Sequence, residues 1–160
     1  MKVTRLLVVC SDNTCCSPLA EALLQRGAIG RGRRDIWVES ASAAGFRGLP
    51  VCTLPQDFAH SLGLDLGAHR SSPLTAEKIL EADLVLCLEE RHRRAVTALV
   101  PDAADRTLLL SHYLPPPSGD TDILDPHGSG RSSFRRTGER IVEACQALLD
   151  GLPKSARPEA

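Results

Sequence analysis

A polar turn near the N-terminus holds three of the six cysteines of the chain: Cys10, Cys15 and Cys16. The apolar run Leu6–Val9 before it, β-branched at its end, is typical of a strand buried on both faces. Ser17, as N-cap, and Pro18, in the first turn, predict a helix directly after it. Backbone N–H groups in such a turn can converge on an anion, and the helix dipole adds partial positive charge. The same field would lower the pKa of the Cys10 thiol and make its thiolate a nucleophile.

An ordinary strand–helix turn that holds a buried cysteine would give the same pattern, so both interpretations remain open. The other three cysteines lie in or beside apolar stretches, as small core residues do: Cys52, Cys87 and Cys145. Met1–Arg5 leads straight into the first strand without a secretion signal, and the chain is long enough to bury its own core. Cysteine usage therefore indicates a reducing, cytoplasmic compartment rather than a disulfide framework.

Strand-like and helix-like segments alternate along the rest of the chain. Further strands are expected at Ile36–Ser40, Ala82–Cys87 and Thr107–Leu110, and further helices at Pro55–Leu62, Thr75–Glu81, Glu89–Leu99 and Phe134–Leu149. A loop rich in Gly and Arg is expected at Gly27–Arg34, after the first helix. This order predicts an α/β fold of three layers, in which a central four-stranded parallel sheet lies between helices. A binding site would lie at the carboxyl ends of the strands. We expect one domain over residues 1–152 and a flexible tail at 153–160.

Charge and composition narrow the function classes. The 160 residues include 19 Lys and Arg against 20 Asp and Glu, a net charge of −1, which argues against nucleic acid as a partner. Hydrophobic residues make up 42% and charged residues 24%, an ordinary globular mixture. The longest apolar runs are far too short to cross a bilayer, so no membrane association is expected.

Several motifs, taken in order, resemble the low-molecular-weight protein tyrosine phosphatase family of the bacterial type. Cys10–Pro18 resembles its signature Cys-x-Gly-Asn-x-Cys-Arg-Ser-Pro, and Asp122–Pro126 resembles its acid loop. Three segments between them also match, namely Val38–Ser42 (the Ser-Ala-Gly strand), Gly67–Ser72 (the His-containing segment) and Ala82–Leu88 (the strand before a His-Arg helix, here Arg91–Arg93). The resemblance runs from Val3 to about Leu152 and implies the Rossmann-like fold of that family.

The resemblance also implies a chemistry, hydrolysis of phosphomonoesters of the phosphotyrosine type without a cofactor or a metal. The Cys10 thiolate would attack the phosphorus, and Asp125 would protonate the departing oxygen and later activate water. The substrate would be a phosphorylated protein or a small phosphomonoester. The implied phosphate loop is Ser11, Asp12, Asn13, Thr14, Cys15, Cys16 and Ser17, supported by Ser40 and His69, with Phe46 and His127 as cleft walls.

Two departures from the family pattern fall inside the loop. Cys16 stands where the family has an arginine that clamps the phosphoryl oxygens, and Asp12 stands where it has a glycine. Loss of an arginine that stabilises a phosphoryl transition state can cost about 10³–10⁵ in rate. The two changes together alter the local charge by −2, although Asp tolerates a left-handed backbone better than most residues. We therefore expect weak or atypical activity.

Other residues could modify this expectation. Arg47, Arg131 and Arg135 are candidates to replace the missing arginine by their loop positions, although surface arginines usually only interact with solvent. Thr14 is also found in the phosphoarginine-specific branch of the family, but the acid loop matches that branch only in part because His127 replaces its aromatic residue. Thr14 is equally well explained as a small loop residue.

A second class of function remains open, that of an inactive family member which binds a ligand or partner through the former active-site cleft. Cys10 and Cys15 match the two loop cysteines that pair reversibly under oxidation in the family, and Cys16 adds a third thiol. Such a loop could sense redox state, or bind a soft metal such as zinc, but it lacks the Cys-x2-Cys pairs of structural zinc sites. Arsenate reduction is disfavoured, since Glu89 and Glu90 stand where that activity needs further cysteines.

Overall fold

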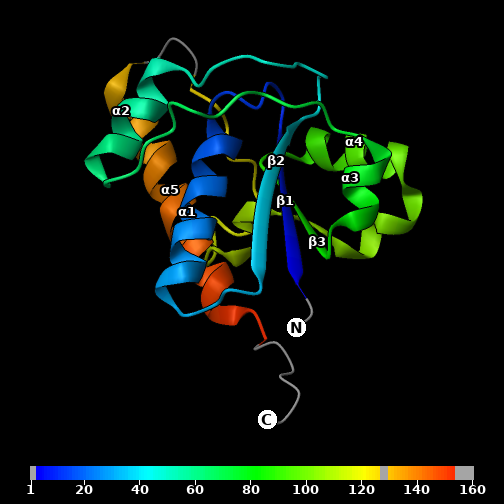
Figure 1. Cartoon of the computed structure of the whole chain (residues 1–160). Coiled ribbons are helices and arrows are strands. Elements are labelled where there is room, and N and C mark those ends of the chain that lie inside the picture. Colours follow the sequence, from blue (N-terminus) through cyan, green and yellow to red (C-terminus); the bar gives the residue numbers. More distant parts are fainter. Residues whose placement is uncertain (1–2, 127–129, 154–160) are drawn as a thin grey trace.

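The computed structural model describes residues 3–126 and 130–153. Four parallel strands form one sheet in the order β2-β1-β3-β4 (Figure 1). Their bounds are β1 Thr4–Cys10, β2 Ile36–Ser42, β3 Leu84–Cys87 and β4 Thr107–Leu109. The parallel sheet predicted from the sequence is confirmed. His127, and the predicted tail beyond Pro153, lie outside the described residues.

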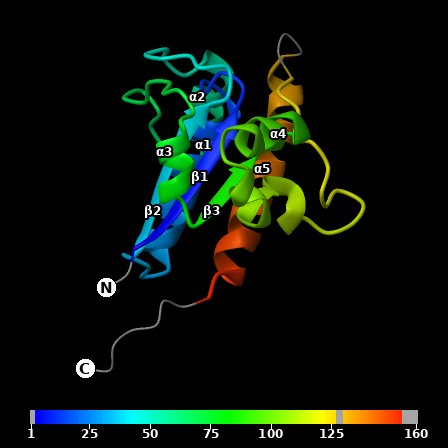
Figure 2. The ribbon, with the colours of Figure 1, turned by 90° about the vertical axis from the view of Figure 1, so that its right-hand side faces the viewer.

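Helices cover both faces of the sheet, as the three-layer prediction requires (Figures 1 and 2). One layer contains α1 (Cys16–Gly30), α2 (Thr53–Ser61) and α5 (Arg131–Gly151). The other contains α3 (Ala76–Glu81) and α4 (Glu90–Leu99). Short 3₁₀ segments, η1 (Pro101–Arg106) and η2 (Leu110–Tyr113), flank β4. No helix within residues 3–126 and 130–153 is long and apolar enough to span a membrane.

The central strand β1 is buried on both faces, as its continuous apolar run predicts. Leu6 and Val8 belong to the core under α1 and α5, whereas Leu7 and Val9 belong to the core under α3 and α4. At the carboxyl end of the strand, Cys10 pairs in register with Ser42 of β2. The loops that follow β1, β2 and β3 therefore meet at one edge of the sheet, where the site was expected.

The beginning and the end of α1 differ from the sequence prediction. The N-cap is Cys15, not Ser17, and it makes no side-chain capping bond. Ser17 lies inside the first turn, and its hydroxyl points back to the loop, where it contacts Cys10. The helix also continues through Gly27, which was expected to begin a loop. A Cβ atom on Gly27 would lie only 2.6 Å from Leu149 Cδ1, so this glycine allows α1 and α5 to approach closely.

Candidate active site

The loop between β1 and α1 is organised around the side chain of Asn13, which is completely buried. Its Nδ2 donates hydrogen bonds of 2.8 Å to Ser17 Oγ and 2.8 Å to Ser40 Oγ. Its Oδ1 accepts from the backbone N–H of Ser72 at 2.9 Å. The backbone of Asn13 has a φ of 59°, a left-handed conformation that Asn tolerates better than most residues. One side chain thus ties together α1, β2 and the segment before α3.

Two further contacts hold this arrangement from outside. His69 Nε2 donates to the backbone carbonyl of Asn13 at 3.0 Å. Ser40 Oγ donates to Glu21 Oε1 at 2.6 Å, and burial raises the pKa of the Glu21 carboxyl above its ordinary value. The sequence pointed to Asn13, Ser40 and His69, but it did not point to Glu21.

The Cys10 thiol receives two contacts from this loop. Ser17 Oγ lies 2.9 Å from Cys10 Sγ, and the backbone N–H of Asn13 donates to the same sulfur at 3.3 Å. Since Ser17 Oγ already accepts from Asn13, its own proton can go to the sulfur. Burial nevertheless raises the pKa of the Cys10 thiol, and it outweighs the lowering effect of these hydrogen bonds. The expectation of a lowered thiol pKa was therefore wrong, because burial removes the thiolate from water.

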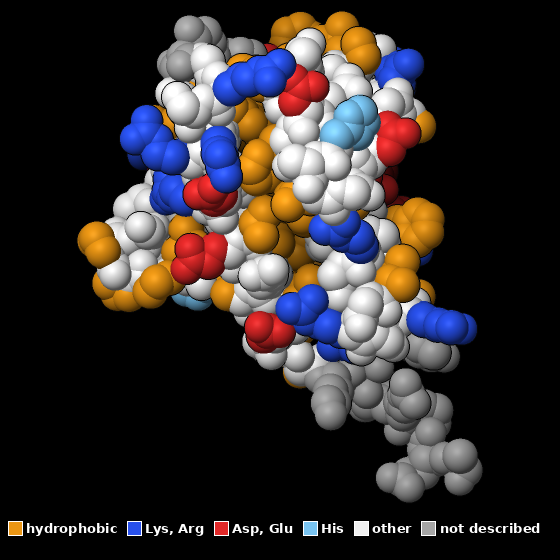
Figure 3. All heavy atoms as spheres, turned by 90° about the vertical axis from the view of Figure 1, so that its left-hand side faces the viewer, with side chains coloured by type: hydrophobic (Ala, Val, Ile, Leu, Met, Phe, Trp, Pro, Cys, Tyr) orange, Lys and Arg blue, Asp and Glu red, His pale blue; other side chains and the backbone are white. Residues whose placement is uncertain are grey.

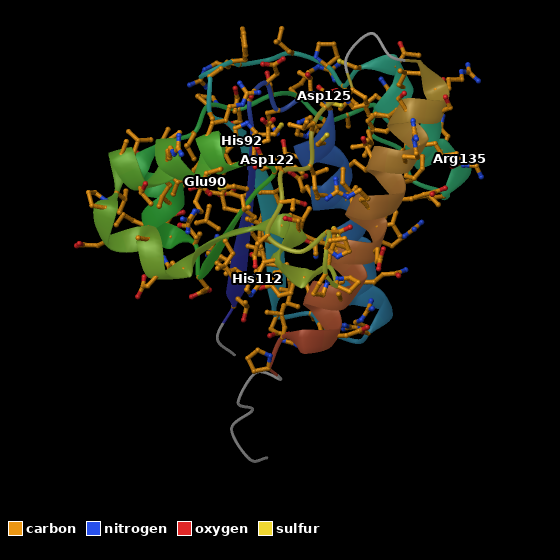
Figure 4. The ribbon with its side chains drawn as sticks, turned by 180° about the vertical axis from the view of Figure 1, so that it is seen from behind. Glu90, His92, His112, Asp122, Asp125 and Arg135 are labelled. Atoms are coloured by element: carbon orange, nitrogen blue, oxygen red, sulfur yellow. The ribbon has the colours of Figure 1, made fainter. Side chains whose placement is uncertain are left out.

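A cavity of about 370 Å³ opens above Cys10. Asp125 lines it from the loop before α5, so the two residues predicted as nucleophile and acid face the same space. This acid loop is anchored to the β3–α4 junction by two hydrogen bonds of 2.8 Å, from the Ile123 N–H to the Leu88 carbonyl and from the Glu90 N–H to Asp122 Oδ1. Figure 4 shows Asp125 and Asp122 at the same end of the molecule as His92 of α4.

Cys16 lines the cavity from the first position of α1 and is almost fully buried. Its Sγ donates to Cys15 Sγ at 3.8 Å, and this contact, with burial and the nearby Asp125, raises the pKa of the Cys15 thiol.

Among the described residues other than glycine, only Asn13 and Asp120 have a positive φ. Asp12 therefore causes no left-handed strain, and its effect on the loop is its charge.

The charged groups that line the cavity are mostly acidic. Asp12, Glu89 and Asp125 contribute carboxylates, and Arg91 is the single Lys or Arg among the described lining residues. The Arg91 guanidinium pairs with both oxygens of the Glu89 carboxylate, through Nε at 2.9 Å and Nη2 at 3.2 Å. Among the described lining residues, an anion that enters the cavity therefore meets three carboxylates and one arginine that is already paired.

Two of the arginines considered as replacements lie at a different cavity. Arg131 and Arg135 line a space of about 680 Å³ between α2 and α5, where apolar side chains form a hollow bordered by charged ones (Figure 3). Arg131 pairs there with Asp57 at 3.4 Å, and Arg135 pairs with Glu139 at 3.2 Å. Arg47 is not among the described residues that line either cavity.

Phe46 and Thr14, two further predicted site residues, are not among the described residues that line the cavity above Cys10. Phe46 is 45% exposed. Thr14 is buried, and its hydroxyl accepts from Cys52 Sγ at 3.7 Å. Cys52 is only half-buried, so its prediction as a core residue was wrong, whereas Cys87 and Cys145 are core residues as predicted.

One contact in the cavity was missed by sequence reasoning. Ser11 Oγ lies 2.8 Å from Nε2 of His92, which comes from α4. The signal in the sequence was the Arg91–Arg93 segment, which gave no indication of distance to the loop.

No group of three or more His, Cys, Asp and Glu side chains in the described part of the chain is arranged to hold a metal ion.

Comparison with known proteins assigns this architecture to a family. Residues 5–157 match the family described as low molecular weight phosphotyrosine protein phosphatase, and the chain belongs to this family. It is 31% identical over 146 residues to the low molecular weight protein-tyrosine-phosphatase Etp of Escherichia coli K12, covering 91% of this chain and 93% of that one. It is also 31% identical over 156 residues to the protein-arginine-phosphatase of Bacillus subtilis, covering 95% and 99%.

Solved structures agree with this assignment. A YwlE arginine phosphatase mutant with a phosphorylated active-site serine superimposes with a TM-score of 0.86 at 27% identity, covering 96% of this chain and 98% of that one. Wzb of Vibrio vulnificus in complex with benzylphosphonate superimposes with a TM-score of 0.83 at 29% identity, covering 93% and 99%. The resemblance predicted from the motifs is thereby confirmed.

Proposed function

We propose that this protein is a cysteine phosphatase that hydrolyses phosphomonoesters on proteins slowly, because its loop lacks the arginine clamp. The observation that carries the proposal is the contact between Ser17 Oγ and Cys10 Sγ, 2.9 Å long, within a loop that the Asn13 network holds in place. Asp125 lines the same cavity as Cys10. A nucleophile and a proton donor are thus available to one bound phosphoryl group.

The reaction proceeds in two displacements at phosphorus. Cys10 Sγ, as thiolate, forms an S–P bond while the bond from phosphorus to the leaving oxygen breaks, and protonated Asp125 gives its proton to that oxygen. Water then attacks the phosphorus, Asp125 takes a proton from the water, and the S–P bond breaks. Ser17 Oγ–H and the Asn13 N–H stabilise the thiolate when it leaves.

Two features of the loop limit the rate. Cys16 provides neither the charge nor the forked donors of a guanidinium. Burial raises the pKa of the Cys10 thiol, so only a small fraction is thiolate at neutral pH.

The substrate class follows from the relatives, one named a protein-tyrosine-phosphatase and one a protein-arginine-phosphatase. We extend to this chain the property that these names share, a phosphorylated protein side chain as substrate.

A second candidate function is binding without turnover. It is favoured by the three carboxylates that line the cavity, Asp12, Glu89 and Asp125, against one arginine that is already paired. Such a protein would keep the fold and the loop but would release no phosphate from any monoester.

Hydrolysis of an aryl phosphate separates the two candidates. We expect slow turnover by the wild type, loss of turnover in Cys10→Ser, and retained turnover in Cys52→Ser, a matched control outside the cavity. Turnover that survives in Cys10→Ser would refute the nucleophile assignment. A wild type that turns over nothing would leave binding as the function.

A further inference from the structure

The hydroxyl of Ser11 has no part in the two displacements described above, although Ser11 lines the cavity directly beside Cys10. Its Oγ lies 2.8 Å from Nε2 of His92, which lines the same cavity from α4. The backbone around Ser11 is fixed as well. Its carbonyl accepts from Ser42 Oγ at 2.6 Å and from the Ala44 N–H at 3.0 Å. The hydroxyl is thus held at a defined place in the wall of the cavity.

The direction of the Ser11–His92 hydrogen bond follows from the other side of the imidazole. The backbone N–H of Glu89 donates to His92 Nδ1 at 3.1 Å, so Nδ1 carries a lone pair and no proton. Burial lowers the pKa of His92 below its ordinary value, so the ring is neutral at neutral pH. A neutral imidazole without a proton on Nδ1 carries it on Nε2. Nε2–H therefore donates to Ser11 Oγ.

This tautomer determines what Ser11 can do. Nε2 has no lone pair to accept the Ser11 proton, so His92 cannot act as a base that turns Ser11 into a nucleophile. Within residues 3–126 and 130–153, His92 is the only side-chain partner of Ser11 Oγ. The Ser11 proton therefore remains available to an acceptor inside the cavity.

We propose that Ser11 is a binding residue that donates a hydrogen bond to an oxygen of the bound phosphoryl group, and that His92 is the positioning residue that directs this donor. The ligand class is a tetrahedral oxyanion, and the proposal rests on the proposed function. One neutral donor replaces only part of a guanidinium, which supplies two parallel donors and a charge. The Ser11 donor comes from the loop after β1 and is held by His92 of α4, so it does not depend on the side chain at position 16.

Two matched pairs of variants test the proposal. Ser11→Thr keeps the hydroxyl and Ser11→Ala removes it. His92→Gln places an amide donor near the position of Nε2, whereas His92→Asn keeps only an acceptor for the Glu89 N–H. Binding of inorganic phosphate is measured by titration calorimetry. We expect about ten- to a hundredfold weaker binding in Ser11→Ala and His92→Asn, the usual effect of losing one hydrogen bond to a charged group. Ser11→Thr and His92→Gln should bind within about threefold of the wild type.

A second measurement needs no ligand. Long-range ¹H–¹⁵N NMR correlations of the His92 ring in the whole protein report its tautomer. The proton is expected on Nε2 at neutral pH, and a proton on Nδ1 would overturn the proposal. Equal phosphate affinity in Ser11→Ala and the wild type would overturn it too, as would a wild type that binds no phosphate.

Two combinations of results separate the role of Ser11 from the phosphatase activity. If turnover depends on Cys10 while Ser11→Ala binds phosphate normally, the inference fails and the phosphatase remains. If phosphate binding depends on Ser11 while the wild type hydrolyses no monoester, the inference stands and the enzymatic proposal fails.

Discussion

Asn13 Nδ2 donates a hydrogen bond to Ser40 Oγ at 2.8 Å, and this contact joins the loop after β1 to the neighbouring strand β2. The same amide group donates to Ser17 Oγ, which contacts the Cys10 thiol. The loop is therefore held by groups that do not include position 16. This explains how the loop keeps its shape although the arginine of the family pattern is missing.

Asn13→Ala should destabilise the protein strongly. The substitution removes three hydrogen bonds in a fully buried position and places alanine at a φ of 59°. We expect a loss of about 2–4 kcal/mol in the free energy of unfolding, measured by urea denaturation. Asn13→Gly loses the same hydrogen bonds without the left-handed strain and should be about 1 kcal/mol less destabilised than Asn13→Ala. A change below about 0.5 kcal/mol in both variants would show that the network does not stabilise the fold.

The reactivity of Cys10 should increase with pH well into the alkaline range. Burial raises the pKa of this thiol above the ordinary value for cysteine, and only the thiolate reacts with iodoacetamide. Alkylation of Cys10, followed by peptide mass spectrometry, should give an inflection above pH 9 in the wild type. Cys16→Arg should move the inflection to lower pH, because a guanidinium beside the sulfur favours the thiolate. An inflection near neutral pH in the wild type would contradict the burial argument.

Asp125→Asn should slow substrates with poor leaving groups more than substrates with good ones. A basic leaving oxygen needs a proton as its bond to phosphorus breaks, whereas a stabilised aryl oxide leaves without one. Alkyl phosphate and nitrophenyl phosphate hydrolysis, compared in the wild type and in Asp125→Asn, provide the measurement. The deficit for the alkyl ester is expected to be about 10²–10⁴-fold. An equal deficit for both substrates would remove Asp125 from the acid role.

Acid conditions should destabilise the protein in part through His92. Its pKa in the folded state is lowered by burial, so the unfolded state binds more protons as pH falls below about 6.5. The stability that the neutral ring contributes is present above that pH and is lost as pH falls through the folded pKa. His92→Gln should therefore show a smaller loss of unfolding free energy between pH 7 and pH 5.

The difference between wild type and variant isolates this effect. Glu21 has the opposite effect, because its raised pKa makes the folded state bind a proton more readily than the unfolded state, which stabilises the fold at low pH. This contribution is the same in the wild type and in His92→Gln. Identical pH profiles for wild type and His92→Gln would contradict the assignment of a buried neutral imidazole.

The fold could be predicted from the sequence because burial on both faces leaves a continuous apolar signal in strands such as Leu6–Val9. The ends of α1 could not be predicted from the sequence. A serine can serve as an N-cap, but Ser17 contacts a thiol instead. A glycine can end a helix, but Gly27 allows α5 to pack closely against α1. The Ser11–His92 contact joins residues 81 positions apart and depends on the register of β1 and β3. Local patterns carry no information about such a distance.

The proposed function requires that the loop is a phosphate cradle whose framework is in place and whose arginine clamp is missing. Cys16 lines the cavity, so an arginine at this position would project toward the bound anion, and Asp12→Gly would remove a carboxylate from the same wall. The two changes together alter the local charge by +2 and restore a forked donor, although their effects need not add because the sites are close.

Aryl phosphate turnover and phosphate inhibition should be measured for the wild type, Cys16→Arg, Asp12→Gly and the double variant. We expect tighter phosphate inhibition and a rate increase of at least about 10² in the double variant, a modest share of what such an arginine contributes to phosphoryl transfer. Cys16→Arg alone should give most of the gain. A folded double variant that neither binds phosphate more tightly nor turns over faster would show that the loop is not a phosphate cradle.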